Sequence, residues 1–290
     1  MTVIGIDIGG SKTHGVRVSS GTVEREAFAA SANISSVGLR EAGLQLRSLA
    51  SDLGRSGVEA ICVGAAGVDA PEAEQRLHQL VQEHFPATPV RIVHDTQLVL
   101  AAAGLTEGAV LISGTGSAAW GRNAAGEHAR AGGWGYVLGD EGGAYGVVRS
   151  AVRHALHRGD QGLPVDRLTA SLLRSVNVST PTELLERFYA EPAPRGWAAR
   201  AGLVFDLARA EEEPAVQIVE AAAAELVQAV TRVCARLNLP GPVVLAGGMV
   251  SHQPLLQSLV RTALAEHDLH DVRLLEQDPV HGAVTLALTH

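Results

Sequence analysis

Residues 3–18 of the chain read VIGIDIGGSKTHGVRV, and the fold can be worked out from this stretch. Val3–Ile8 is rich in β-branched residues and is predicted to form a strand. Gly9 and Gly10 then predict a turn, because glycine adopts backbone conformations that other residues avoid. Thr13–Val18 is predicted to form the returning strand, so the chain opens with a hairpin that has glycines at its tip.

Helices and strands alternate after this hairpin. A third strand at Thr22–Ala29 continues the antiparallel meander. This order predicts a mixed sheet with an antiparallel edge and parallel strand–helix–strand crossovers. The segment up to residue 103 is predicted to contain helices Arg40–Leu53, Glu72–Phe85 and Thr96–Ala103 and strands Glu59–Ala66 and Val90–Val93.

A second strand–glycine turn–strand unit follows near residue 114. Ala109–Ser113 and Ser117–Arg122 are predicted strands, and Gly114-Thr115-Gly116 is the turn between them. Two related halves with facing glycine hairpins are what an enzyme that clamps a polyphosphate in a cleft would need. The remaining predicted elements are strands His128–Ala131, Val243–Ala246 and Val272–Leu275, and helices Gly143–His157, Val165–Val176, Thr182–Tyr189, Trp197–Ala210, Ala215–Leu237, Pro254–Glu266 and Val280–Leu288.

The composition limits the class of protein. A length of 290 residues gives a prior of about two domains. The net charge of −8 argues against a general nucleic-acid coat, which needs basic charge to replace counterions. No run approaches the roughly 18 apolar residues of a membrane span, and the N-terminus has Asp7 where a signal peptide would be basic. We therefore expect a cytoplasmic protein that binds neither nucleic acid nor membranes.

The first hairpin tip has the chemistry of a phosphate loop. Gly9 and Gly10 would let the backbone approach a ligand, and the amides of the turn can point at phosphate oxygens. Lys12 could add a charge, Thr13 a hydroxyl, and Asp7 a carboxylate where a phosphate-bound metal would sit, through water. The alternative is an ordinary glycine-rich β-turn.

Two further glycine sites strengthen this interpretation. Gly114–Gly116 repeats the small-residue turn in the second half of the chain. Gly247 and Gly248 end a buried strand and precede a helix, and ligands of open α/β sheets bind at the carboxyl ends of strands. A plain strand–helix turn is the alternative for the last pair.

Three other positions could act on a substrate. Asp95 follows a predicted strand and could be a general base, or only the N-cap of the next helix. The glycine-dense loop 132–143 contains Trp134, Asp140 and Glu141, and it could shape a ligand site or cap the helix that follows. Asn33 lies between a strand and a helix, where its amide could bind vicinal hydroxyls.

With these residues assembled, the chain resembles the N-acetylglucosamine kinase branch of the acetate kinase/hexokinase/actin superfamily, a grouping that includes the BadF/BadG/BcrA/BcrD ATPases. The motifs SGTGS at 113–117, GGWG at 132–135 and LGDEG at 138–142 carry the resemblance, which covers most of the chain. It implies an α/β fold of two actin-like ATPase (ribonuclease H-like) domains with a nucleotide cleft between them. The first would comprise residues 1–106 plus 279–290, and the second residues 107–278.

The resemblance also implies roles for individual residues. Asp95 would be the catalytic base. The residues implied in ATP binding are Gly9, Gly10, Ser11, Lys12, Thr13, Gly114, Thr115, Gly116, Ala210, Gly247 and Gly248. The residues implied in substrate binding are Asn33, Ile34, Asp95, Ser117, Gly133, Trp134, Gly135 and Asp140. Enzymes of this family are commonly homodimers, so a homodimer is expected.

The resulting hypothesis is an ATP-dependent kinase that phosphorylates the 6-hydroxyl of N-acetylglucosamine or a close amino sugar. A glucosamine kinase and a non-catalytic sugar or nucleotide sensor on the same fold are the alternatives. Asp95 favours catalysis, since a sensor needs no base. Cys62 and Cys234 stand alone, which sets aside the zinc-binding repressor relatives and the iron–sulfur dehydratase activators.

Overall fold

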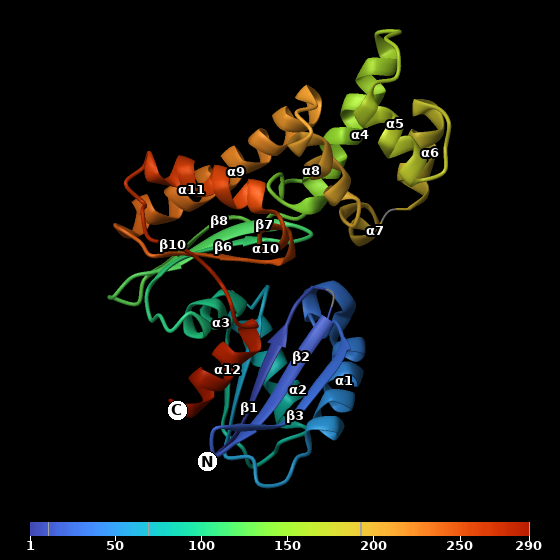
Figure 1. Ribbon diagram of the computed structural model, residues 1–290. Helices are drawn as coiled ribbons and strands as arrows, with labels where there is room; N and C mark the ends of the chain where they lie inside the picture. Colours follow the sequence, from blue (N-terminus) through green and yellow to red (C-terminus); the bar gives the residue numbers. More distant parts are fainter. Residues whose placement is uncertain (11, 69, 192, 290) are drawn as a thin grey trace. The chain divides into compact units, whose positions relative to one another are not determined.

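The computed structural model describes residues 1–10, 12–68, 70–191 and 193–289. The chain forms two compact units (Figure 1). Unit 1 consists of Met1–Thr106 and Leu275–His290, and unit 2 of Glu107–Leu274. Residues 275–278 therefore belong to unit 1, whereas the sequence placed them in the second domain. The reason is local, because Asp278 caps the last helix and contacts His14 of unit 1.

Unit 1 contains the predicted mixed sheet, with strand order β3-β2-β1-β4-β5. The first three strands form the antiparallel meander, and β4 and β5 join it in parallel. The glycine hairpin thus lies beside parallel strands, as the alternation of elements predicts. The strands are β1 (Thr2–Ile8), β2 (Lys12–Ser19), β3 (Thr22–Ala30), β4 (Ala60–Ala65) and β5 (Val90–His94).

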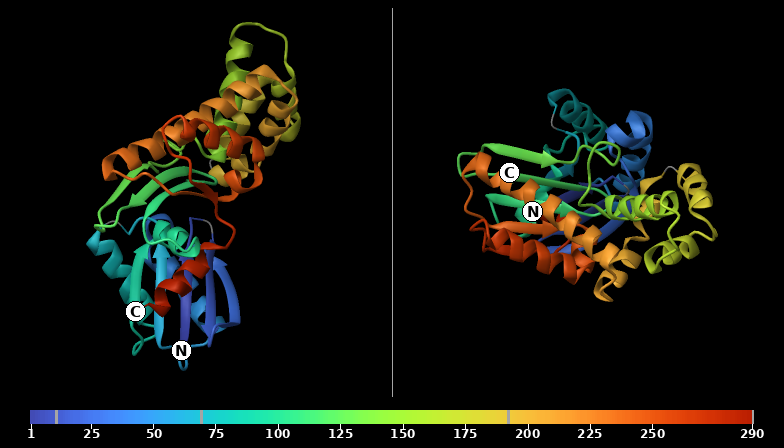
Figure 2. Two further views of the ribbon diagram at one scale, coloured as in Figure 1. Left: turned by 60° about the vertical axis from the view of Figure 1, so that its left-hand side comes forward. Right: turned by 90° about the horizontal axis from the view of Figure 1, so that it is seen from above.

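Helices cover both faces of this sheet. On one face α1 (Ile34–Leu53) and α2 (Pro71–Gln82) bury an aliphatic core that includes Ile4, Ile6 and Ile8. On the other face α3 (Asp95–Ala102) and α12 (Pro279–Leu288) cover the alternate residues of β1. Figure 2 shows α12 beside β1, so that the two ends of the chain pack together.

Two glycines allow the second pair of helices to approach closely. A Cβ atom at Gly64 of β4 would lie 2.3 Å from the side chain of Leu98 in α3. A Cβ atom at Gly282 of α12 would lie only 1.9 Å from the carbonyl oxygen of the same leucine. These contacts place the amino ends of α3 and α12 next to the carboxyl end of β1.

Helix α1 begins at Ile34, six residues before the predicted start. Asn33 caps it, and its side-chain oxygen accepts a hydrogen bond from the backbone N–H of Ser35. Gly38 has φ +79° and interrupts the helical backbone inside this element. The glycine and the two serines before it weaken the apolar periodicity, which explains why the sequence predicts only the later part.

The sheet of unit 2 has the order β10-β9-β6-β7-β8 and repeats the mixed design. Its long helix α9 (Glu213–Leu237) packs on β6, β7 and β8, and α11 (Pro254–Ala265) packs on α9. The strands are β6 (Gly108–Ser113), β7 (Ser117–Arg122), β8 (His128–Gly132), β9 (Val243–Ala246) and β10 (Val272–Leu274).

A group of helices extends beyond one end of this sheet (Figure 1). It contains α4 (Ala144–Asp160), α5 (Arg167–Ser175), α6 (Pro181–Ala190), α7 (Pro194–Ala198) and α8 (Ala201–Arg209). The single helix predicted at Trp197–Ala210 is therefore wrong at its start, because a break at residues 199–200 separates α7 from α8. The short α10 (Gly248–His252) has no predicted counterpart.

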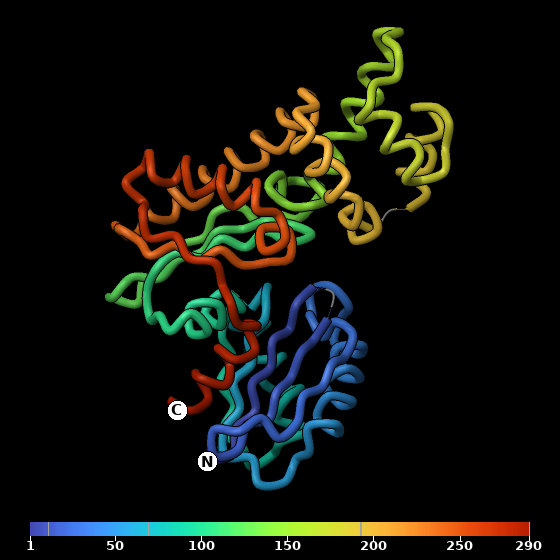
Figure 3. Tube along the Cα trace, in the orientation of Figure 1, coloured from blue at the N-terminus to red at the C-terminus, as the bar shows by residue number. Residues whose placement is uncertain are grey.

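The trace in Figure 3 leaves unit 1 after α3 and returns to it after β10, just before α12. Each unit has its own buried core, one in unit 2 and two in unit 1, on opposite faces of its sheet. Among the described residues, no helix has both the length and the apolar character needed to cross a membrane.

Candidate functional site

Three carboxylates gather at the carboxyl end of β1 in unit 1. Asp7 is the second-last residue of β1, Asp95 begins α3, and Asp278 is the N-cap of α12. Burial raises the pKa of Asp7 to about 7, and the negative charges of Asp95 and Asp278 add to this shift. The fold therefore concentrates negative charge at the strand edge where ligands of such sheets bind.

Asp95 is not the N-cap of α3. That position is taken by His94, whose ring nitrogen Nδ1 lies 2.6 Å from Oγ1 of Thr96 and accepts from its backbone N–H. Nδ1 of His94 also lies 2.9 Å from Oδ1 of Asp95, but this buried oxygen has no hydrogen-bond donor among the described residues. The structure thus excludes the capping alternative and leaves one carboxylate oxygen available to accept a proton.

Among the described residues of the first hairpin tip, Gly10 presents exposed backbone, and the hydroxyl of Thr13 already has hydrogen-bond partners. Gly10 is exposed, and a Cβ atom there would meet no atom within 4 Å. Thr13 is fully buried, and its hydroxyl donates to the carbonyl of Ala30 and accepts from the N–H of Ala32. The ammonium of Lys12 lies 5.5 Å from the centre of the Phe28 ring. Ser11, which was predicted to bind ATP, lies outside the described residues.

Asn33 is buried and already has partners. Besides capping α1, its Nδ2 donates to the carbonyl of Ala66, which follows β4. Asn33 and Ile34 line a small recess together with Gly67. The amide retains one N–H and part of its oxygen for a ligand, so its predicted role rests on these remaining groups.

In unit 2, the second and third glycine sites lie side by side. They follow the parallel neighbours β6 and β9, and a Cβ atom at Gly114 would lie 3.8 Å from the backbone nitrogen of Gly248. Gly247 has φ +101°, and a Cβ atom there would lie 2.6 Å from the carbonyl oxygen of Ser113. Gly248 by contrast has open space around its Cα. The carboxyl ends of β6 and β9 therefore form one edge with exposed backbone.

The amino end of α4 is docked on the second hairpin tip. The backbone N–H groups of Ala144 and Tyr145 donate to the carbonyls of Gly114 and Thr115. The Thr115 residue itself is exposed. The first turn of α4 thus satisfies its backbone donors on the hairpin and fixes the tip in place.

The loop after β8 is held on the same hairpin by Asp140. This residue has φ +62°, which is unusual for a residue other than glycine. Its carboxylate lies against Gly116, where a Cβ atom would come within 2.3 Å of Oδ2. Burial raises the pKa of Asp140, while backbone hydrogen bonds from Ser117 and Gly135 counteract the shift. Asp140 thus connects the predicted sugar loop to the predicted phosphate loop.

Trp134 of this loop is 64% exposed. The guanidinium of Arg130 lies 4.9 Å from the centre of its ring. A recess of about 120 Å³ brings Trp134 together with Ser117 and Asp140, and α9 contributes its other wall. Gly132, Gly133 and Gly135 all have positive φ, so glycine is required by the backbone of this loop.

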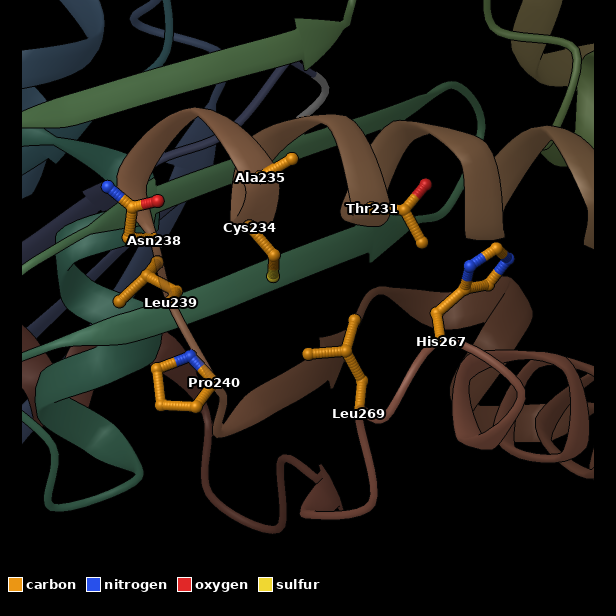
Figure 4. Close-up of a pocket in the computed structure, with 8 residues that line it drawn as sticks. All are labelled: Thr231, Cys234, Ala235, Asn238, Leu239, Pro240, His267 and Leu269. Atoms are coloured by element: carbon orange, nitrogen blue, oxygen red, sulfur yellow. The ribbon is translucent and has the colours of Figure 1, made fainter.

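A larger cavity, of about 460 Å³, lies elsewhere in unit 2 (Figure 4). It is lined by the end of α9, including Cys234 and Asn238, by Pro240 before β9, and by Leu269. It is therefore at the amino end of β9, at the opposite end of the strand from Gly247 and Gly248. No residue predicted to act in the site lines it.

Ala210 is exposed at the carboxyl end of α8. Its neighbour Arg209 donates a hydrogen bond to the side chain of Gln253, the residue that follows α10. This contact brings the end of α8 near the segment that begins with Gly248, as a shared adenosine site would require.

Sequence reasoning missed Asp278 and His14. Asp278 precedes Pro279, which signals a helix start and nothing more. His14 follows the phosphate-loop motif without belonging to it. Only the packing of α12 against the first hairpin reveals that these two residues belong beside Asp7.

The chain is similar in sequence and in fold to several known proteins. The chain is 31% identical to the N-acetylmuramic acid/N-acetylglucosamine kinase of Clostridium acetobutylicum over 98% of this chain and 97% of the relative. It is 30% identical to the N-acetyl-D-glucosamine kinase of Dictyostelium discoideum, with the same coverage. The solved structure of a candidate N-acetylglucosamine kinase from Chromobacterium violaceum matches with a TM-score of 0.78 and 24% identity, over 99% of this chain and 98% of that one.

The structural match and the similarity to other actin-like proteins confirm the predicted α/β fold of two actin-like domains. The family model of the BadF/BadG/BcrA/BcrD ATPases matches residues 4–287, which is nearly the whole chain. Together with two curated relatives at 30% identity or more, this match confirms the predicted family. The chain belongs to the BadF/BadG/BcrA/BcrD ATPase family.

Proposed function

We propose that this protein is an ATP-dependent kinase that phosphorylates the 6-hydroxyl of N-acetylglucosamine or a close amino sugar. The observation that carries the proposal is Asp95, which presents a buried carboxylate oxygen with no donor among the described residues. Both curated relatives are named as amino-sugar kinases, which supports the substrate class. Membership of an ATPase family supports ATP as the phosphoryl donor.

Asp95 is proposed to act as the general base. Its Oδ1 accepts the proton of the sugar hydroxyl while the hydroxyl oxygen attacks the γ-phosphorus and the bond to the β–γ bridging oxygen breaks. A carboxylate suits this task because phosphoryl transfer depends mainly on orienting the acceptor and stabilising charge.

The glycine turns are proposed to bind the nucleotide. Gly9–Thr13 of unit 1 and Gly114–Gly116 of unit 2 would offer backbone amides to the phosphates. Lys12 could add a positive charge. Gly247 and Gly248, with Ala210, would accommodate the adenosine, and the open space at Gly248 supports this role.

The acidic residues around Asp7 fit a magnesium ion that is bound through water. A carboxyl whose pKa is raised to about 7 beside two other acids would gain from a nearby cation. Among the described residues no group of three or more side chains is arranged to hold a metal directly. Mg²⁺ commonly keeps its waters and binds nucleotide phosphates, so Asp7 alone would suffice. When bound, the ion would neutralise charge on the transferred phosphoryl group.

The residues predicted to bind the substrate are proposed to contact the sugar. Asn33 and Ile34 line a recess in unit 1, and Ser117 and Asp140 line one in unit 2. The exposed ring of Trp134 could cover the apolar face of the sugar or its acetyl methyl group. Gly133 and Gly135 would let this loop approach the ligand. We also propose that the enzyme acts in the cytoplasm as a homodimer.

A coupled ADP-release assay tests the proposal directly. The purified protein is mixed with MgATP and, separately, with glucose, glucosamine, N-acetylglucosamine, N-acetylmuramic acid or N-acetylmannosamine. Turnover with N-acetylglucosamine, lost with its 6-deoxy analogue, is the expected result. Preference for glucosamine would favour the alternative kinase. Sugar binding without turnover would identify a sensor and reject the kinase.

A further inference from the structure

The buried side chain of His14 takes part in an ionic network that the proposed reaction does not explain. The residue is 3% exposed, and its ring stacks on Phe28 with centroids 4.2 Å apart. Nε2 shares a 2.8 Å hydrogen bond with Oε1 of Glu26, whereas Nδ1 lies at an ion-pair distance of 3.3 Å from Oδ1 of Asp278. The imidazole therefore has a carboxylate at each of its two nitrogens. Burial lowers the pKa of His14, but Asp278 and Glu26 raise it above its usual value on balance.

The network is next to Asp7. In the pairing of β1 with β2, His14 lies directly opposite Asp7, so both side chains are on the same face of the sheet. That face is the one covered by α12, whose N-cap is Asp278. Nδ1 of His14 therefore links strand β2 to the start of α12 at the point where the three carboxylates meet.

Helix capping alone does not account for this arrangement. Oδ1 of Asp278 accepts from the backbone N–H of Val280, and this bond requires no histidine. The side chains of Glu26 and Asp278 remain 52% and 38% exposed, and ion pairs with exposed partners contribute little to stability. The contact is therefore better explained by what it does to the position of the Asp278 carboxylate.

We propose that His14 is a positioning residue of the phosphoryl-transfer site, which holds the Asp278 carboxylate beside Asp7 and so adds a negative charge near the site proposed for the magnesium–nucleotide. This inference rests on the proposed function. The third carboxylate increases the attraction for the cation that accompanies the phosphates. The charge of Asp278 already acts on Asp7, since it contributes to the raised pKa of that residue.

Two substitutions at position 14 separate the two ring nitrogens. The amide nitrogen of asparagine can occupy the place of Nδ1 and donate to Asp278, whereas that of glutamine reaches towards the place of Nε2 and Glu26. His14→Asn should therefore keep the positioning contact, and His14→Gln should lose it. Asp278→Asn removes the charge and retains a good N-cap.

The readout is nucleotide binding, measured by calorimetry with ADP in Mg²⁺ and in EDTA. We expect Asp278→Asn and His14→Gln to reduce the magnesium-dependent gain in ADP affinity by about tenfold, as loss of one charge near a cation would. In His14→Asn, the magnesium-dependent gain in ADP affinity should stay within about threefold of the wild-type value. Glu24→Gln is the matched control, because Glu24 pairs with Arg17 on the same hairpin, away from Asp278.

If His14→Asn and His14→Gln reduce the magnesium-dependent gain in ADP affinity equally, the proposal is overturned. It is also overturned if that gain falls only in variants whose Tm is lower. Because the binding assay uses no sugar and no turnover, it separates this inference from the proposed function. A protein that shows the binding pattern but phosphorylates no sugar would retain the positioning role and reject the kinase. A protein that phosphorylates the sugar, but whose variants bind ADP like the wild type, would retain the proposed kinase activity and reject the positioning role.

Discussion

Asp95 is the residue on which catalysis is proposed to depend. Substituting Asp95→Asn preserves its size but removes proton acceptance, so kcat should fall by about 10²–10⁴, the usual range for a lost general base. Because His94 and not Asp95 caps α3, the Tm should not change. Steady-state assays with N-acetylglucosamine and a thermal melt check both statements. Near-wild-type kcat in this variant would reject Asp95 as the base.

The raised pKa of Asp7 predicts how the free energy of unfolding depends on pH. Its folded pKa of about 7 lies above the ordinary value of 3.8, so the folded state favours the protonated form. The favourable contribution of protonated Asp7 to the free energy of unfolding is complete below pH 3.8 and is lost as the pH rises through 7. The difference of about three pKa units corresponds to at most about 4 kcal/mol.

Asp7→Asn should therefore raise the free energy of unfolding, and by more at pH 8 than at pH 5. Urea unfolding in EDTA at the two pH values measures this difference. A gain of the same size at both would show that Asp7 does not titrate in this range.

The sequence could predict Asp95 and the glycine turns of the site, but it could not predict His14 and Asp278. Asp95 and the glycine turns lie at strand ends that local pattern reveals. Asp278 is 264 positions from His14, and their contact depends on α12 returning to the first hairpin. No local pattern encodes such a contact, and both residues carry ordinary roles, a helix cap and a strand residue, when they are considered alone.

At the scale of elements, the two hairpins should respond differently to substitution of their glycines. A side chain at Gly10 meets open space, whereas one at Gly116 would displace Asp140. Gly10→Val should raise the KM for ATP without lowering the Tm. Gly116→Val should also raise the KM for the sugar, because the loop that carries Trp134 is held by Asp140. Identical kinetic effects of the two variants would contradict the link between the second hairpin and this loop.

The loop after β8 should govern sugar binding more than nucleotide binding. Asp140→Gly removes the carboxylate that contacts Ser117 and Gly135, and glycine tolerates the φ of +62°. The sugar KM should rise about tenfold or more, since a charged hydrogen bond contributes roughly 1.5–3 kcal/mol. ADP affinity, measured without sugar, should change little. Equal weakening of both ligands would make the loop a purely structural element.

Errors in the predicted elements have two kinds of cause, local sequence and tertiary packing. Glycine and serine hide the first turns of α1, and the break between α7 and α8 falls at Ala199 and Arg200, both good helix formers. Tertiary packing, with Trp197 buried under α4, decides that break. Strand β1, which is rich in β-branched residues, and the short, fully buried β9 match their predicted bounds within one residue.

For the whole molecule, the separate cores of the two units make their stabilities separable. Every Trp and Tyr of the chain lies in unit 2, at positions 120, 134 and 197 and at 136, 145 and 189. Aromatic fluorescence therefore reports on unit 2 alone, whereas far-UV circular dichroism reports on both units. Unit 1 can be weakened selectively at Gly282, where α12 touches the backbone of α3.

Gly282→Val should therefore separate the two unfolding transitions. The added side chain forces α12 away from Leu98, which exposes the core of β1, α3 and α12 and should cost about 3 kcal/mol or more. Far-UV dichroism should then begin to change at a lower urea concentration than tryptophan fluorescence. Ala235→Val, at an exposed position of α9 in unit 2, is the control and should leave the two signals coincident. If the two signals also stay coincident in Gly282→Val, the units unfold as one cooperative body, and α12 stabilises the whole protein rather than unit 1.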